Sequence, residues 1–413
     1  SVKLNGQNIL TYSDIKRKYI HQNAQRIITL SVNNIKYKPT DNNRNIHTLS
    51  AREQTGNLVG IVGKEGVGKT TLLKLLAGYL IPDQGNIEIN GYDLKKNRYL
   101  LKDIIGFVPE EDLLFDELTV FDNLWMTAKL YYSNLTHNVI RKKIDQLLID
   151  LALTDIKDVV VGNVLDKNIQ PGQRRILNIA LELLREPQLL LVDNALAGLS
   201  MTDSAKVIKV LHNYTLEGKL VITSISQVGS NIFGYFDNIW ILDEGGYPLY
   251  TGRCSKLSEF FSQHLKLTEQ HHDTIDPAVI IDLINHQVCD VKTHVSQRAY
   301  SPEKWHQLYL TSFEKSEKEP SRKTVFPSRI IRVPNLETQY LIFSIRNFKC
   351  KFSRIYNLIY TLLSAPLFAF FIGFFLRHSD KGKYVFAENT NLPAYQYISV
   401  IINLFFGIVL SAN

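Results

Sequence analysis

Through residues 28–262, short apolar runs alternate with stretches in which apolar side chains recur every three or four positions. The runs at 58–62 and 189–192 are typical of buried strands because they are short, apolar and followed by glycine or aspartate. The stretch before the second run has one apolar helix face, formed by Ile176, Ala180 and Leu183. Asn90 and Gly91, between two apolar runs, predict a tight hairpin turn. Strands that alternate with helices predict an α/β fold.

Two long uncharged stretches lie near the C-terminal end. Residues 355–376 contain no charged side chain and are bracketed by Arg354 and Arg377, and a second apolar stretch covers 392–412. A helix needs about 20 apolar residues to cross roughly 30 Å of hydrocarbon. The pattern therefore predicts two transmembrane helices in contact with a lipid bilayer. The alternative is a buried helix of a large soluble core.

The segment before the first stretch has apolar positions at helical spacing, with basic residues between them. These apolar positions are Leu341, Ile345, Phe348 and Phe352. The pattern predicts either a helix that lies among lipid headgroups or an ordinary surface helix packed on the preceding domain. The basic residues that flank residues 355–376 are slightly more numerous on the N-terminal side, which places that side in the cytoplasm.

The formal net charge is +7, a value that could indicate nucleic-acid binding. Between Lys292 and Arg354, however, thirteen Lys and Arg stand against five Glu, and an apolar stretch follows. No nucleic-acid partner is therefore expected. The three cysteines, Cys254, Cys289 and Cys350, occur singly, so neither a zinc site nor a disulfide framework is predicted. Since no apolar leader heads the chain, its bulk is expected to be cytosolic.

A glycine-rich turn, GKEGVGKT, follows the apolar run at 58–62 and leads into an apolar-periodic helix. Glycines let successive backbone N–H groups point at phosphate oxygens, while Lys69 offers a positive charge and Thr70 a hydroxyl for magnesium. The turn therefore predicts a nucleotide site with the candidate ligands Gly63, Gly66, Gly68, Lys69, Thr70 and Thr71. The D-x-x-G and N-K-x-D motifs of a small GTPase are absent downstream.

Taken together, these motifs resemble the ATP-binding cassette of ABC transporters over about residues 28–262. The cassette precedes the apolar stretches, as in G-type half-transporters and similar bacterial ATPase-permease fusions. The resemblance implies an α/β P-loop NTPase fold with a helical subdomain, followed by an all-α transmembrane segment. It also implies ATP and Mg²⁺ as cofactors, and a second cassette chain, identical or different, as partner. Residues 336–413 would be the connecting helix and the first two helices of a permease domain.

The same resemblance assigns roles to individual residues. Tyr37 would stack on adenine, although a packing role for this tyrosine is an equal alternative. Asp193 would be the Walker B carboxylate, Glu110 would occupy the Q-loop position, and both would join Thr70 around magnesium. The signature covers 169–173, so Gln170, Gly172 and Gln173 would contact the nucleotide held by the partner chain. Ser226 would occupy the switch-histidine position.

Several catalytic positions depart from the family pattern. Asn194 replaces the glutamate that would polarise the attacking water, and an amide has no useful basicity at neutral pH. Ser226 replaces the histidine, and Gln170 and Pro171 replace signature residues, of which Pro171 has no N–H to donate. Ser200 stands at the D-loop aspartate position. Since loss of a general base alone typically slows a reaction about 10²- to 10⁴-fold, we expect ATP binding with weak hydrolysis, and whether the chain is an enzyme stays open.

Two other functions remain open at this point. Glu110 is a carboxylate at a position where a glutamine is expected, so it is a candidate displaced base in a competent ATPase. The other alternative is a membrane-anchored module that senses ATP and transports nothing. The sequence does not indicate a transported substrate.

The remaining segments carry less information. Residues 1–27 match no pattern, and residues 263–335 are polar, rich in proline and predicted to be a linker without a core. The expected location is the cell (inner) membrane, with the nucleotide-binding domain on the cytoplasmic side.

Overall fold

The computed structural model describes residues 2–4, 8–10, 27–39, 45–163, 168–226, 230–265, 287–289, 296–298, 300–313, 333–353, 355–375, 379–380, 383–384 and 392–411. The chain forms two compact units, residues 1–335 and 336–413. Much of the predicted linker and most of residues 1–27 lie outside the described residues.

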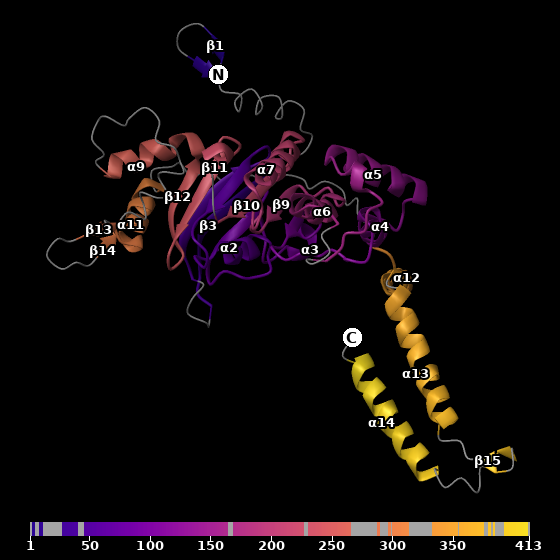
Figure 1. Ribbon diagram of the computed structural model, residues 1–413. Helices are drawn as coiled ribbons and strands as arrows, with labels where there is room; N and C mark the ends of the chain where they lie inside the picture. The colour runs from indigo at the N-terminus through magenta and orange to yellow at the C-terminus, as the bar shows by residue number, and fades with distance from the viewer. Residues whose placement is uncertain are drawn as a thin grey trace. The chain divides into compact units, whose positions relative to one another are not determined.

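A six-stranded sheet forms the centre of the first unit (Figure 1). Its spatial order is β12-β11-β5-β10-β9-β8, and all neighbours are parallel except the β11–β12 pair. The strands are β5 (Leu58–Val62), β8 (Ile105–Val108), β9 (Leu189–Val192), β10 (Leu220–Ile225), β11 (Asn238–Asp243) and β12 (Tyr247–Arg253). Strands β5 and β9 are fully buried, as their apolar sequences predict.

A second, antiparallel sheet has the order β4-β3-β6-β7. Its strands are β3 (Thr29–Tyr37), β4 (Ile46–Gln54), β6 (Gln84–Ile89) and β7 (Tyr92–Asp93). The predicted hairpin turn is present between β6 and β7, where Asn90 and Gly91 have φ angles of 53° and 76°. Both angles lie in the left-handed region, which asparagine and glycine tolerate better than other residues.

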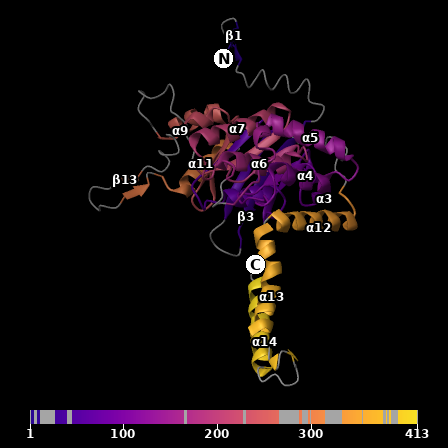
Figure 2. The ribbon, with the colours of Figure 1, turned by 45° about the vertical axis from the view of Figure 1, so that its right-hand side comes forward.

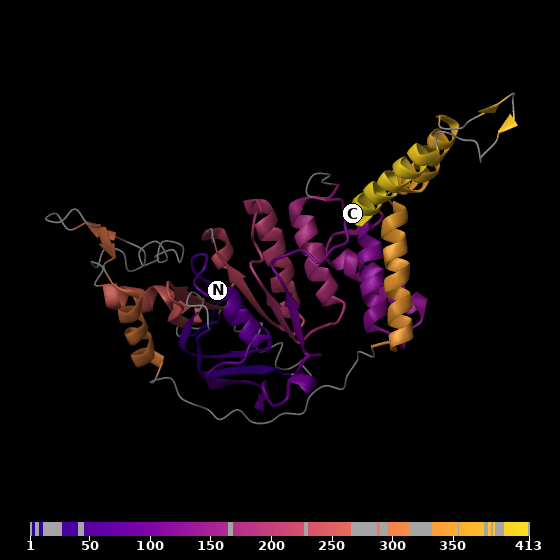
Figure 3. The same cartoon turned by 90° about the horizontal axis from the view of Figure 1, so that it is seen from below.

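Helices cover both faces of the six-stranded sheet. They are α2 (Lys69–Leu76), α3 (Arg98–Leu101), α4 (Val120–Tyr131), α5 (His137–Asp150), α6 (Pro171–Leu183), α7 (Met201–Leu216), α8 (Ser230–Phe233) and α9 (Leu257–Leu265). In Figure 3 the indigo strands of the antiparallel sheet lie to one side of the magenta helices. Helices α4 and α5 contact each other and lie in the sequence between Glu110 and Asp193, where the helical subdomain was expected.

Alternating side chains of the central strands divide the core into two clusters. Leu190 and Val192 of β9 pack with residues of α4 to α7, whereas Leu189 and Leu191 pack with α2 and the antiparallel sheet. Successive side chains of a strand point to opposite faces, so a strand that is apolar at every position requires cover on both sides. The unit is therefore layered, with the six-stranded sheet in the middle.

Helix α11 (Pro302–Phe313) lies inside the segment predicted to be a linker, yet it packs on β12 of the first unit. Trp305, His306 and Tyr309 are at most 8% exposed. The Tyr309 hydroxyl donates to Ser50 O at 2.8 Å and accepts from Ser50 N at 3.0 Å. The prediction of a linker without a core is therefore wrong for residues 302–313, because three bulky side chains at helical spacing are buried there against β4 and β12.

The second unit contains α12 (Leu336–Ser353), α13 (Ile355–Phe375), α14 (Leu392–Ser411) and the short strands β15 (Ser379–Asp380) and β16 (Lys383–Tyr384). Figure 2 shows α13 and α14 side by side, with a sharp bend between α12 and α13. Helices thus form near both predicted spans, 355–376 and 392–412. Within the described part of the chain, however, no helix meets the length and apolarity needed to cross a membrane. The two spans stay a prediction.

Candidate functional site

Four neighbouring strands of the central sheet bring the predicted site residues together. The glycine-rich turn follows β5, Glu110 lies just beyond β8, Asp193 and Asn194 follow β9, and Ser226 follows β10. Because these strands are parallel, their carboxyl ends meet at one edge, where they line a cavity of about 770 Å³. Its lining is Tyr37, Pro39, Glu65, Gly66, Gly68, Lys69, Thr70, Thr71, Lys74, Leu80, Glu110, Asp193, Asn194, Ser224 and Ser226.

The glycine-rich turn requires residues without side chains. Gly66 and Gly68 have φ angles of 82° and 104°, a region that disfavours L residues. A Cβ added to Gly63 would lie 2.4 Å from Leu242 O, so a side chain there would clash with β11. The backbone can therefore curl and direct its N–H groups into the cavity at the start of α2.

Lys69 is held inside this turn. Its Nζ donates to Gly63 O and Lys64 O, both at 2.6 Å, and the residue is 7% exposed. Burial lowers the pKa of Lys69 below its ordinary value, although the carboxylates of Glu65, Asp193 and Glu110 partly oppose this. An ammonium group whose partners here are carbonyl oxygens is suited to bind a polyanion, because phosphate oxygens offer it full negative charge.

Oxygen ligands suitable for magnesium converge on Asp193. Thr70 Oγ1 donates to Asp193 Oδ1 at 3.1 Å, and Ser224 Oγ donates to the same oxygen at 2.7 Å. Asp193 is 3% exposed. A hydroxyl and a carboxylate beside a phosphate-binding turn fit Mg²⁺, which is usually bound by one or two protein oxygens with substrate phosphates and waters. Among the described residues, no three His, Cys, Asp or Glu form a metal cluster of their own.

Asn194 connects the positions that depart from the family pattern. Its Nδ2 donates to Glu110 Oε1 at 2.6 Å, and Ser226 Oγ donates to its Oδ1 at 3.4 Å. Its backbone N–H donates to Ser224 Oγ at 2.7 Å, with φ at 45°. Asparagine tolerates this left-handed conformation better than most residues. The structure therefore places Glu110, Asn194 and Ser226 in one hydrogen-bonded chain.

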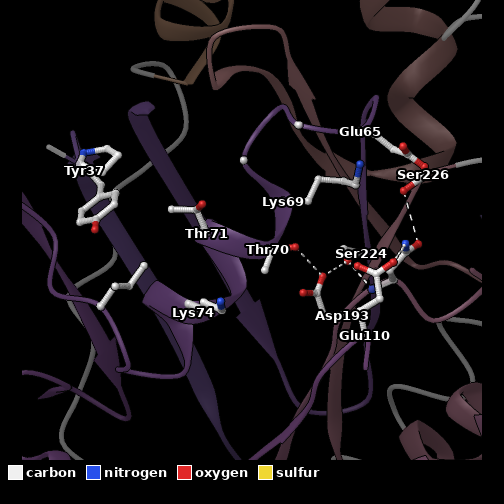
Figure 4. A pocket seen from close by; sticks show the side chains of 15 residues that line it. Tyr37, Glu65, Lys69, Thr70, Thr71, Lys74, Glu110, Asp193, Ser224 and Ser226 are labelled. Carbon is white, nitrogen blue, oxygen red and sulfur yellow. Dashed lines mark hydrogen bonds between the residues drawn. The ribbon is translucent and has the colours of Figure 1, made fainter. Parts of the chain in front are cut away.

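Tyr37 lies apart from the group formed by Lys69, Thr70, Asp193 and Ser224 (Figure 4). It ends β3 and lines the cavity together with Pro39 and Leu80. This arrangement gives the cavity an aromatic end and a charged end. The position is compatible with stacking on a nucleobase, while the role itself stays a prediction.

The predicted signature residues lie elsewhere. Gln170, Gly172 and Gln173 begin α6 and do not line the cavity. Gln173 Oε1 accepts from the Gln170 N–H at 3.0 Å, which caps the helix. A Cβ added to Gly172 would lie 2.7 Å from the Cβ of Asp203, so this glycine permits close packing of α6 on α7. At the start of α7, Ser200 Oγ accepts from the Asp203 N–H at 3.2 Å and is therefore a helix cap.

Sequence reasoning missed Ser224 and Arg175. Ser224 is a buried hydroxyl within the apolar strand β10. The Arg175 guanidinium, from the buried face of α6, donates to Pro109 O at 2.9 Å, to Glu110 O at 3.2 Å and to Asp193 O. Burial lowers the pKa of Arg175 below its ordinary value, although the nearby carboxylates of Asp112, Asp193 and Glu110 partly oppose this. The signal available in the sequence was a basic residue directly before the apolar helix position Ile176.

Comparisons with known proteins agree with this geometry. The family profile described as ABC transporter matches residues 46–197. The chain is 30% identical to a probable ATP-dependent permease of Saccharomyces cerevisiae over 64% of this chain and 26% of that protein. It is 31% identical to ABC transporter G family member 21 of Arabidopsis thaliana over 62% of this chain and 38% of that protein. The chain thus spans about a quarter to two fifths of the length of these relatives.

A solved structure supports the fold alone. The chain is similar to cbiO1 from Clostridium perfringens, described as part of the ABC transporter complex cbiONQ, with a TM-score of 0.50 and 23% identity. The match covers 59% of this chain and 95% of that one. The α/β P-loop fold expected from the sequence is therefore confirmed for the first unit. Residues 46–197 belong to the ABC transporter family, and this chain carries the family's ATP-binding cassette in its N-terminal part.

Proposed function

We propose that the cassette binds ATP with Mg²⁺ in the cavity at the carboxyl edge of the parallel sheet. The observation that carries this proposal is the placement of Lys69, Thr70 and Asp193 around one cavity beside the glycine-rich turn. In this arrangement the Thr70 hydroxyl lies 3.1 Å from the Asp193 carboxylate. The turn's N–H groups and Lys69 hold the phosphates, and Tyr37 stacks on adenine at the opposite end. Thr70 and Asp193 hold magnesium, with Glu110 as a further oxygen ligand. Bound magnesium neutralises charge on the phosphate oxygens.

The proposed partner is a second cassette chain. Gln170 and Pro171 are exposed at the start of α6, away from the cavity of their own chain. In a head-to-tail pair, Gln170, Gly172 and Gln173 would contact the nucleotide of the partner chain. Bound ATP would then lie between two cassettes and stabilise their closed arrangement.

Cassette closure is proposed to act on a membrane domain that begins at α12. Leu341, Ile345, Phe348 and Phe352 of this helix are 44% to 63% exposed, with Lys349 and Lys351 among them. Such a helix suits the headgroup region of a bilayer, where apolar side chains and anionic lipids both find partners. The cassette would lie on the cytoplasmic side of the cell (inner) membrane, and residues 336–413 would provide the connecting helix and two spans.

Hydrolysis at this site is proposed to be slow. Asn194, the residue after Asp193, carries an amide that has no useful basicity, and Ser226 carries a hydroxyl in place of an imidazole. The Asn194 amide is bound to Glu110, to which its Nδ2 donates at 2.6 Å. ATP occupancy would therefore persist, and the cassette would behave more as a nucleotide-responsive clamp than as a fast motor.

Titration calorimetry with MgATP tests the binding step on the purified chain. Lys69→Ala removes a charge-assisted hydrogen bond worth about 1.5–3 kcal/mol, so affinity should fall at least about tenfold. Lys64→Ala is the matched control, because its ammonium pairs with Glu244 and both side chains are more than half exposed. Wild-type protein that binds no MgATP, or equal losses in both variants, would contradict the site. Wild-type turnover on the order of 1 to 100 per second would contradict slow hydrolysis.

A further inference from the structure

Four aromatic rings lie where α11 contacts strands β4 and β12. His47 of β4 stacks on Tyr247 of β12, with ring centroids 3.7 Å apart and an angle of 9° between the planes. His306 of α11 lies beside this pair, with centroid distances of 6.0 Å to His47 and 5.6 Å to Tyr247. Tyr309, one turn further along α11, stacks on His306 at 5.8 Å. These four residues, here called the ring cluster, place two imidazoles at the contact.

His306 is the more enclosed of the two imidazoles. It is buried, whereas His47 is half-buried. His306 Nδ1 lies 3.0 Å from Pro248 O, and because a carbonyl oxygen can only accept a hydrogen bond, Nδ1 carries the proton of the neutral ring. A second proton must therefore bind at Nε2, where it gives the buried ring a full positive charge. A buried charge without a counter-ion destabilises the state that contains it.

The surroundings of His306 do not compensate such a charge. Burial lowers the pKa of His306 below its ordinary value, the hydrogen bond to Pro248 O opposes this, and the ammonium of Lys36 on β3 adds to it. Tyr247 and Tyr309 supply no negative charge, because burial raises the pKa of both phenols. Within the described part of the chain, His306 forms no ion pair with a carboxylate.

His47 is better placed to carry a positive charge. Burial lowers its pKa, with smaller contributions from His306 and Lys36, but the exposed carboxylate of Glu303 on α11 opposes them. The face of the Tyr247 ring, stacked on His47, also attracts a cation. His306 is therefore the imidazole whose protonation disturbs the contact most.

We propose that protonation of His306 releases α11 from β4 and β12, so that the ring cluster acts as a pH-sensitive switch. Docking lowers the pKa of His306 below 6.5, so the released form binds the proton more tightly. The stabilisation of docking is thus fully present above pH 6.5, and it is lost as the pH falls from there through the pKa of docked His306. The helix has 12 residues, a length that is marginal for an isolated helix in water, so its amides lose protection on release.

Hydrogen–deuterium exchange of the full-length chain at about pH 7.5 and about pH 5.5 tests this switch, with labelling times corrected for the intrinsic pH dependence of exchange. Peptides from α11 should lose protection at the lower pH, by up to about tenfold for each unit by which docking lowers the pKa. Peptides from the buried strand β5 should stay protected. His306→Gln should keep α11 protected at both pH values, because an amide can still donate to Pro248 O but takes up no proton.

Two further variants complete the comparison. His137→Gln is the matched control, since His137 is exposed at the start of α5, and its α11 should lose protection as in the wild type. Lys36→Met removes the nearby positive charge and leaves the four rings in place, so α11 should be released at a lower pH than in the wild type.

Several results would overturn the proposal. Protection of α11 that is equal at both pH values in the wild type shows that no switch operates. An equal loss in the wild type and His306→Gln excludes His306 as the titrating group. Simultaneous loss in α11 and β5 indicates global unfolding rather than local release. If His306→Gln leaves α11 unprotected even at the higher pH, Lys36→Met decides, and a release pH at or above that of the wild type overturns the proposal.

Discussion

Replacing Arg175 with methionine should destabilise the backbone segments that position Glu110 and Asp193. The guanidinium reaches from α6 to three backbone carbonyls, those of Pro109, Glu110 and Asp193, and the residue is 6% exposed. Two of these carbonyls belong to residues of the cavity itself. Methionine has a similar length and keeps the apolar packing, so the variant isolates the loss of the hydrogen bonds.

The number of stranded carbonyls sets the size of the effect. A buried acceptor left without its donor costs about 1–3 kcal/mol. The Arg175→Met variant removes one buried bond, to Asp193 O, and two part-buried bonds, to Pro109 O and Glu110 O. Part of this cost is offset, because the substitution also removes a buried charge and a buried Nε that has no hydrogen-bond partner. A loss of about 3 kcal/mol in the free energy of unfolding is therefore expected, equivalent to a melting temperature roughly 6–12 °C lower. MgATP affinity should fall as well, because Asp193 and Glu110 are no longer anchored.

Thermal unfolding and calorimetry on the same preparations check both effects. Arg174→Met is the matched control, since Arg174 pairs with Asp112 and Asp116 near the surface, where ion pairs contribute about 0–1 kcal/mol. An equal loss of stability in the two variants, or unchanged MgATP affinity in Arg175→Met, would refute the anchoring role.

Two further predictions concern the body of the cassette. Trp305→Ala should lower the free energy of unfolding by about 3–5 kcal/mol and expose α11 to protease, because Trp305 is 1% exposed and packs against Phe261 at 5.2 Å between ring centroids. A protease pattern identical to wild type would contradict the docking of α11. Burial raises the pKa of Glu53 from 4.5 to about 7, partly opposed by hydrogen bonds from Asn57, Trp240 and Asn238. The folded protein therefore retains the proton that the unfolded chain loses, so this group's contribution to stability falls by about 3 kcal/mol at most as the pH rises from 4.5 to 7. Urea unfolding at both pH values measures this change. The free energy of unfolding should decline less between pH 4.5 and 7 in Glu53→Gln than in the wild type, and equal declines in the two proteins would contradict the role of Glu53.

Local patterns in the sequence were sufficient to bring Lys69, Thr70 and Asp193 to one edge of the predicted sheet. The glycine-rich turn after β5 and the carboxylate after β9 belong to parallel strands, whose carboxyl ends meet by the geometry of the sheet. Apolar runs of strand length that alternate with helical stretches predicted the α/β fold. The helix face at Ile176, Ala180 and Leu183 is buried, as its spacing predicts.

Contacts between residues far apart in the sequence were decided by the tertiary structure. Spacing along the chain could not show that Asn194 bonds to Glu110, 84 positions earlier, because that contact depends on the pairing of β8 with β9. The packing of α11 against Ser50 could not be predicted either, because Tyr309 and Ser50 are far apart in the sequence. The segments on both sides of α11 are also polar, a pattern typical of a linker. Residue types and local periodicity thus determined which groups could bind a nucleotide. The order of the strands determined which of those groups touch, because hydrogen bonds act over about 3 Å while the sequence separates their partners by tens of residues.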